Sequence, residues 1–135
     1  MSESARVLVV DDAATVRAYH GAVLRDGGFE VSEAGNGYEA LESSLQQPYD
    51  LHVVDVNMPQ MDGYSFIRAL RSEGLVPDAP VIMISTEGEE ADAQRAYEAG
   101  ANLYLVKPVA PDHLLLTAQI LTGRLGGGTG TGVVA

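Results

Sequence analysis

Five short apolar runs, separated by longer segments with helical periodicity, limit the fold of this chain more than any other feature. The runs lie at 7–10, 29–33, 51–54, 81–84 and 103–106. Continuous β-branched and aliphatic residues are typical of strands that are buried on both faces of a parallel sheet. The second run instead alternates apolar with polar residues, which indicates an edge strand. We therefore predict five strands, with the second at a sheet edge.

The intervening segments predict five helices. Their predicted ranges are 13–25, 38–46, 63–72, 89–99 and 111–124. Apolar residues recur in them at the spacing of an amphipathic helix. In the first helix the side chains expected to face the core are Val16, Tyr19, Val23 and Leu24. Strands that alternate with helices predict a parallel sheet with helices on both faces, joined by right-handed crossovers.

The length and composition suit one globular domain, which we place at 1–125. The chain has 135 residues, of which 46% are hydrophobic and 20% are charged, as in ordinary globular proteins. Residues 126–132 are all glycine or threonine, so we expect a flexible glycine-rich tail over 126–135. The polar N-terminus has no signal region and no apolar run reaches membrane-spanning length, so we expect a cytoplasmic protein.

The charge and the missing cysteines exclude several classes of function. The formal net charge is −11, and such an acidic surface repels nucleic acid and anionic membranes. It favours a metal cation or a partner with a basic patch. Without cysteine there is no disulfide, thiol catalysis or cysteine-based zinc site. The three histidines have no metal-binding spacing, and we expect them at the surface or packed: His20, His52 and His113.

Reactive polar side chains follow four of the apolar runs, at the point where each run ends. Asp11 and Asp12 follow the first, Asp55 the third and Lys107 the fifth, while Ser85 and Thr86 follow the fourth. Ligands of an open parallel sheet bind outside the carboxyl ends of its strands. These carboxylates, hydroxyls and the ammonium group are therefore expected to meet in one shallow cleft.

Three carboxylates in one cleft indicate a divalent cation, because crowded negative charges repel unless a cation joins them. Their hard oxygen ligands favour Mg²⁺ or Mn²⁺ over zinc. Asp12 could also simply cap the following helix. An aspartate such as Asp55 can act as a nucleophile toward phosphorus, with Lys107 and Ser85 supplying a cation and a hydroxyl to the phosphoryl oxygens. The residues thus predict magnesium-assisted phosphoryl transfer.

At this point the chain resembles the response-regulator receiver family. The motifs that carry the resemblance are Val9–Asp12, Val54–Gly63, Ile84–Thr86 and Val106–Pro108. They occur in the family's order and place the resemblance over about residues 6–124. The resemblance implies a flavodoxin-like, doubly wound α/β fold, with a five-stranded parallel sheet of order 2-1-3-4-5 and five helices.

The resemblance also implies roles at the site. Asp55 would be the phosphoacceptor. Mg²⁺ would be held by Asp12, Asp55 and the backbone carbonyl of Asn57, with Asp11 acting on the ion mainly through water. Lys107 would pair with the phosphoryl group. The family usually has a cis peptide bond before the proline that follows this lysine.

A second set of residues is expected to relay the signal and to set its duration. The resemblance makes Ser85 and Tyr104 the switch pair, in which the hydroxyl moves toward the phosphate and the aromatic ring moves inward. In the family, the positions of Asn57 and Glu87 flank the path of the attacking water, and an amide and an acid there resemble the chemotaxis type, whose phosphate is short-lived. Thr86 is larger than the alanine common in that type, and its bulk could crowd the phosphate. These three positions are expected to tune the phosphate lifetime.

The sequence shows no output domain, so signalling through a changed surface is expected. The sequence of the Asn57–Gly63 segment resembles that of stand-alone, monomeric chemotaxis receivers of the CheY kind. Such receivers take phosphate from a histidine kinase and bind a flagellar motor switch component, and a phosphatase can be a further partner. This implies a phosphoacceptor protein, not an enzyme, that catalyses only its own phosphorylation and dephosphorylation.

Two alternatives stay open and a third is disfavoured. A phosphorelay shuttle or phosphate sink, passing phosphate between histidine proteins, would use the same site. A phosphate-independent interaction module is the alternative of another class, although it leaves the acidic cluster without a use. A true phosphatase would need a general acid two residues after the nucleophile, and Asn57 cannot serve as one.

Overall fold

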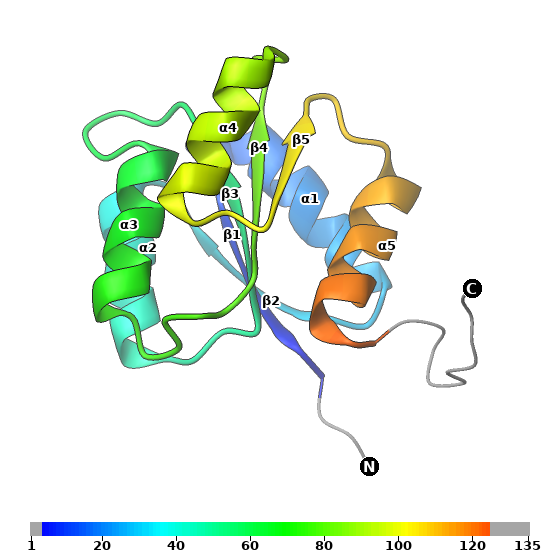
Figure 1. The fold of residues 1–135 in the computed structure, drawn as a ribbon. Helices are drawn as coiled ribbons and strands as arrows, with labels where there is room; N and C mark the ends of the chain where they lie inside the picture. Colours follow the sequence, from blue (N-terminus) through cyan, green and yellow to red (C-terminus); the bar gives the residue numbers. More distant parts are fainter. Residues whose placement is uncertain (1–3, 125–135) are drawn as a thin grey trace.

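The structure, a computed structural model, describes residues 4–124 of the chain (Figure 1). Its elements in chain order are β1 Arg6–Val10, α1 Ala14–Asp26, β2 Glu30–Ala34, α2 Gly37–Gln46, β3 Leu51–Asp55, α3 Gly63–Glu73, β4 Val81–Ser85, α4 Glu90–Ala99, β5 Leu103–Val106 and α5 Pro111–Thr122. The predicted tail, 126–135, lies outside the described residues. No helix within residues 4–124 combines the length and the apolar composition needed to cross a membrane.

The five strands form one parallel sheet in the order β2-β1-β3-β4-β5, which confirms the predicted fold and strand order. Val10 lies opposite Val54 on the neighbouring strand, and Ser85 lies opposite Val106. Because all strands run in the same direction, their carboxyl ends share one edge of the sheet. The residues that directly follow β1, β3, β4 and β5 are therefore neighbours in space.

Helices cover both faces of the sheet, and the sheet divides the core into two layers (Figure 1). α1 and α5 pack on one face, where Leu24 and Leu114 are completely buried. α2, α3 and α4 pack on the other, where Phe66 and Ile67 are completely buried. Every residue of β3 and β4 is buried, as expected for strands with helices above and below. The partly exposed β2 and β5 are the two edges.

Short polar side chains and glycines set several helix ends. The Asn36 side chain accepts a hydrogen bond from the Glu39 N–H at the start of α2 (2.9 Å), and Asp62 accepts from Ser65 at the start of α3 (2.8 Å). α5 ends at Thr122, two residues before the predicted end. The next residue, Gly123, has a φ of 72°, a left-handed conformation that glycine adopts without strain.

The buried side of α1 differs from the predicted one. We expected Tyr19 to face the core, but its side chain is 46% exposed. The buried residues of this helix are His20, Gly21 and Leu24. Histidine and glycine do not register as apolar, so a hydropathy pattern places the inward stripe about one position away from the true one.

Candidate functional site

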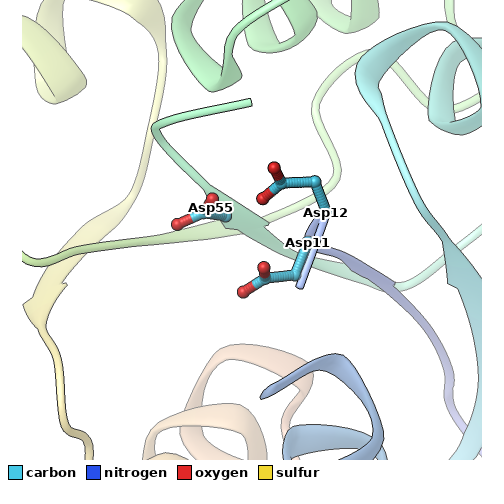
Figure 2. A group of neighbouring side chains, drawn as sticks. All are labelled: Asp11, Asp12 and Asp55. Atoms are coloured by element: carbon cyan, nitrogen blue, oxygen red, sulfur yellow. The ribbon is translucent and has the colours of Figure 1, made fainter. Parts of the chain in front are cut away.

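Three aspartates gather at the carboxyl edge of the sheet. Asp11 and Asp12 directly follow β1, and Asp55 is the last residue of the adjacent β3. Figure 2 shows their carboxylates side by side, and one oxygen of each lies within 4.8 Å of the others. Asp11 and Asp55 are buried, whereas Asp12 is exposed. The structure thus brings together the three carboxylates that the sequence placed in one cleft.

A single lysine connects two of these carboxylates. The Lys107 Nζ atom lies 2.9 Å from Asp55 Oδ1 and 3.2 Å from Asp11 Oδ2. The lysine directly follows β5, and its backbone N–H donates a 2.7 Å hydrogen bond to the Ser85 carbonyl of β4. The pairing of β5 with β4 therefore positions the Lys107 ammonium group beside the aspartates. The peptide bond between Lys107 and Pro108 is cis, as the family resemblance implied.

The ionisation of the site reflects burial opposed by pairing. Burial is the largest influence on the pKa of Asp55 and raises it, and the negative charges of Asp11 and Asp12 act in the same direction, while the hydrogen bond from Lys107 opposes them. For Lys107, burial acts to lower the pKa. The hydrogen bond to Asp55 and the charges of Asp55 and Asp11 outweigh burial, and the pKa of Lys107 is raised.

The donor set fits a hard divalent cation. The cluster offers carboxylate oxygens alone, which are the ligands that Mg²⁺ prefers. Among the described residues, Lys107 is the one cation that forms an ion pair with these carboxylates, so a single paired positive charge faces three negative ones. A bound divalent cation would balance the charge that remains. Asn57, whose backbone carbonyl is predicted to join Asp12 and Asp55 as a direct ligand, lies exposed in the β3–α3 connection.

The start of α1 holds Asp11 in place. The Asp11 Oδ1 atom accepts a 2.9 Å hydrogen bond from the Ala13 N–H, and its backbone carbonyl accepts a 2.6 Å bond from Arg17 Nη1. Arg17 also pairs with Glu33 at 3.2 Å. Sequence reasoning missed Arg17, because an arginine on a helix usually faces solvent. The alternative that Asp12 caps α1 is not seen, since Ala13 is the N-cap and no side chain caps it.

The predicted switch residues are linked through one backbone segment. The Ser85 hydroxyl is completely buried and accepts a 3.0 Å hydrogen bond from the Glu87 N–H. The Tyr104 hydroxyl donates to the Glu87 carbonyl at 2.5 Å. Within residues 4–124, no hydrogen bond joins the Ser85 hydroxyl to Asp55 or Lys107. Ser85 and Tyr104 are therefore connected to each other through Glu87, while the hydroxyl is turned toward the loop.

The remaining predicted site residues lie around the rim. Thr86 and Glu87 are exposed where β4 ends, and Thr86 lines a pocket together with Lys107. Of the three histidines, His20 and His52 are buried and His113 is exposed. The histidine positions agree with the expectation of packed or surface residues.

Comparison with known proteins identifies the family. The model of the response regulator receiver domain matches residues 7–119, which include every residue of the acidic cluster and Lys107. The chain belongs to the response regulator receiver family. Receiver domains are signalling phosphoacceptors rather than classical enzymes; histidine kinases phosphorylate them, they bind Mg²⁺ in an acidic pocket, and they act on downstream targets.

Relatives of this receiver include both transcriptional and chemotaxis proteins. The transcriptional regulatory protein PrrA of Mycobacterium tuberculosis is 42% identical over 123 residues, which are 91% of this chain and 52% of PrrA. The probable chemotaxis protein CheY of Rhizobium etli is 33% identical over 126 residues, 93% of this chain and 98% of that protein. The chain spans about half the length, or less, of several curated relatives that it matches.

Solved structures of receivers share the fold. The chemotaxis protein CheY4 of Vibrio cholerae superposes with a TM-score of 0.84 at 37% identity, covering 88% of this chain and 99% of CheY4. The receiver domain of the sensor histidine kinase PA1611 of Pseudomonas aeruginosa has a magnesium ion coordinated in its active-site cleft. It superposes with a TM-score of 0.82 at 29% identity, covering 90% of this chain and 99% of that domain.

Proposed function

We propose that this receiver accepts a phosphoryl group on Asp55 from a histidine kinase, in a Mg²⁺-dependent reaction, and signals by changing its surface. One observation carries the proposal: the Lys107 ammonium lies 2.9 Å from Asp55 inside a cluster of three carboxylates. This arrangement joins a nucleophile, a cation for the phosphoryl group and an oxygen-rich site for a metal ion. The magnesium ion in the related PA1611 receiver supports the same assignment here.

In the proposed step, an Asp55 carboxylate oxygen attacks the phosphorus of a phosphohistidine. An O–P bond forms and the N–P bond breaks, with the electron pair leaving on the imidazole nitrogen. Lys107 supplies positive charge beside the incoming phosphoryl oxygens, because such transfers depend on positioning and charge neutralisation. A Mg²⁺ ion held by Asp12, Asp55 and the Asn57 carbonyl, and by Asp11 through water, would neutralise further negative charge.

The hydrogen bonds around Glu87 support a proposed switch between Ser85 and Tyr104. A phosphoryl group on Asp55 offers the Ser85 hydroxyl a stronger acceptor than its present surroundings. When the hydroxyl turns toward it, the Glu87 N–H loses its 3.0 Å partner and the segment that holds the Tyr104 hydroxyl is free to shift. Tyr104 can then move inward, which changes the surface formed by α4, β5 and α5.

Three exposed side chains are proposed to set how long the phosphate lasts. Asn57, Thr86 and Glu87 lie in the two connections that follow β3 and β4, next to the cleft. A water molecule that attacks the aspartyl phosphate has to pass between these connections. The amide and the acid can orient that water, whereas the methyl group of Thr86 can obstruct it. The protein would thus catalyse its own dephosphorylation without acting on another substrate.

For the output, we propose chemotaxis with a flagellar motor switch component as the partner. The Rhizobium etli CheY, of which this chain covers 98%, and the structural likeness to CheY4 support it. A second candidate output is transcriptional control, because the identity to PrrA is higher, at 42%. The two differ in the partner that the phosphorylated surface binds.

The proposal is tested with Mg²⁺ and acetyl phosphate, followed by intact mass. We expect one added phosphoryl group on the wild-type protein and none on Asp55→Asn or in the presence of a chelator. An unmodified wild-type protein, under conditions where Mg²⁺ binding is independently detected, would refute the assignment. If the phosphorylated receiver, but not the unphosphorylated one, pulled down purified motor switch protein, the chemotaxis output would be supported over the transcriptional one.

A further inference from the structure

An apolar pocket of about 490 Å³ opens between α1 and the segment that follows β5. Val16 and Tyr19 of α1 form one wall, and Pro108 and Val109 form the other. This volume lies in the range of pockets that hold small organic molecules. The half-exposed ring of Tyr19, which the hydropathy pattern assigned to the core, is therefore part of the pocket wall.

A buried histidine supplies the polar group of this pocket. His20 lines the pocket and is only 3% exposed, and its ring packs against Tyr19 with the centroids 5.6 Å apart. Within residues 4–124, the His20 ring makes no hydrogen bond, so it has one free N–H donor and one free acceptor when neutral. Burial lowers the pKa of His20, which keeps the ring neutral at ordinary pH. Such a ring fits one polar atom on an otherwise apolar ligand.

The pocket adjoins the phosphorylation cleft. Lys107 lines it together with Thr86, and the Lys107 ammonium contacts Asp55 and Asp11. A molecule whose phosphoryl group lies at Lys107 would therefore have its remaining atoms near the pocket entrance. The ammonium suits the phosphate, and the walls suit an aromatic ring. The pocket and the cleft together match a phosphate ester or anhydride with an apolar leaving group.

We propose that this pocket holds the leaving group of a small-molecule phosphodonor and makes the receiver prefer aromatic acyl phosphates over acetyl phosphate. The inference rests on the proposed function of Asp55. The aromatic ring lies between Tyr19 and Val109, and the His20 N–H donates to the carboxylate that leaves. Tyr19 and Val109 are the specificity-determining residues in this assignment, since they touch the ring of the donor, which does not react, whereas His20 contacts the carboxylate that leaves.

The transfer balances without a further reactant. An Asp55 carboxylate oxygen forms a bond to phosphorus, and the bond between phosphorus and the acyl oxygen breaks. The electron pair stays on that oxygen, so the leaving group departs as a carboxylate and no proton has to move. The His20 N–H stabilises the charge that appears on this carboxylate.

The test compares benzoyl phosphate with acetyl phosphate as donors at saturating Mg²⁺, with intact mass as the readout. The measured quantity is the ratio of the two phosphorylation rates, in wild type and in Tyr19→Ala. Both proteins see the same intrinsic reactivity of the donors, so a change in the ratio reports the pocket. We expect the ratio to fall by about fivefold in Tyr19→Ala, from the lost burial of the ring. His20→Leu keeps the volume but not the N–H, which meets the carboxylate of either donor, so both rates are expected to fall while their ratio stays close to that of the wild type.

Tyr38→Ala is the matched control, because Tyr38 is an exposed tyrosine on α2 that does not line the pocket (56% exposed). Its ratio is expected to equal that of the wild type. Equal ratios in all the variants would overturn the pocket assignment while leaving the function of Asp55 intact. If the ratios were equal but Tyr19→Ala slowed phosphoryl transfer from a phosphorylated histidine protein, the pocket would instead hold a side chain of that protein. Failure of both donors with the wild type would refute the proposed function itself.

NMR shifts provide a readout that does not depend on phosphorylation. Benzoate added without Mg²⁺ is expected to shift the amide resonances around His20 and Val109 in a saturable way, and acetate is expected to shift them less. Identical responses to the two carboxylates would count against an aromatic subsite.

Discussion

At the scale of single residues, burial affects the ionisable groups of this protein in two ways. Asp55 is buried beside a lysine, which supplies a counter-charge at 2.9 Å. His52 is buried at the other end of β3, 1% exposed, between the rings of Tyr49 and Phe66. Among residues 4–124, the Ser44 hydroxyl is the one side chain that forms a hydrogen bond with its ring, at 3.3 Å. The buried carboxyl thus has an ion-pair partner, whereas burial lowers the pKa of the His52 ring and holds it neutral.

The pH dependence of stability is predicted to reflect His52. Burial lowers the pKa of His52 to about 4, from 6.5 in the unfolded chain. The neutral ring thus favours the folded state above the unfolded pKa, and this stability is lost as the pH falls toward the folded pKa. Between about pH 7 and about pH 5 the loss amounts to about 2 kcal/mol. Urea unfolding at the two pH values measures it.

The variant His52→Leu isolates this contribution, because carboxylates also titrate toward the acid end of the range. It is expected to lose less stability than the wild type over the same pH interval, by about 2 kcal/mol. Equal losses in both proteins would show that His52 does not titrate differently in the folded and unfolded states.

A second residue-scale prediction concerns Gln60 in the β3–α3 connection. Its φ of 71° is left-handed, and it is the one non-glycine residue with positive φ in the described chain. A side chain in this conformation is strained, so Gln60→Gly is expected to stabilise the fold by about 1 kcal/mol. Thermal or urea unfolding measures the change.

Gln94→Gly is the opposite case and serves as the control. Gln94 is an exposed residue within α4, where glycine loses helix propensity. This variant is expected to be less stable than the wild type by about 1 kcal/mol. If Gln60→Gly destabilised the protein to the same extent, the strain at residue 60 would be disproved.

At the scale of elements, one arginine joins the ends of several of them. The Arg71 guanidinium of α3 donates to the carbonyls of Pro77 and Ala79 in the α3–β4 connection. It also donates to the Gly100 carbonyl, at 2.6 Å, and to the Asn102 side chain between α4 and β5. These contacts hold α3 and the connections before β4 and β5 together, on the side of the sheet away from the aspartates.

Arg71→Lys is therefore expected to destabilise the protein. A lysine keeps the charge but lacks the planar set of donors, so several carbonyls lose their partner. The expected loss is about 1–3 kcal/mol in the free energy of unfolding, measured by urea titration. Arg68→Lys, an exposed position on the same helix, is the matched control and is expected to change stability by less than about 0.5 kcal/mol. Equal effects at the two positions would show that the hydrogen bonds of Arg71 do not contribute specifically to stability.

At the scale of the whole molecule, the acidic cluster belongs to a chain with a net charge of −11. Any added salt screens the general repulsion among these charges, whereas a specific cation binds at one place. Mg²⁺ is expected to stabilise the folded protein more than NaCl at equal ionic strength. At about ten times its dissociation constant the specific gain is about 1.4 kcal/mol.

The specific part of this gain depends on the aspartates that follow β1. Asp12→Asn is expected to lose most of the difference between Mg²⁺ and NaCl, measured as a shift in the unfolding temperature. Asp78→Asn, which removes one charge from an exposed loop, is expected to retain it. A loss of equal size in both variants would mean that Mg²⁺ acts on the general charge and not at the cluster.

The sequence by itself determined the elements and the chemistry that they carry. Apolar runs and helical periodicity are local properties, so the five strands and five helices could be predicted to within a few residues. The reactive groups also follow strands directly, and parallel strands share one edge. The gathering of Asp11, Asp12, Asp55 and Lys107 could therefore be expected, while the strand order and the roles of these residues came from the family resemblance.

Only the tertiary structure decided which of these groups touch. Lys107 lies 96 positions from Asp11 in the chain, yet its ammonium group contacts both Asp11 and Asp55. The buried ring of His20 in the pocket wall and the turn of the Ser85 hydroxyl toward Glu87 were likewise not visible in the sequence. The same hydropathy pattern is compatible with a helix rotated by one position and with different side-chain rotamers, so it cannot distinguish between them. Hydrogen bonds and ion pairs, in contrast, form or break over less than an ångström, which only packing against the rest of the fold determines.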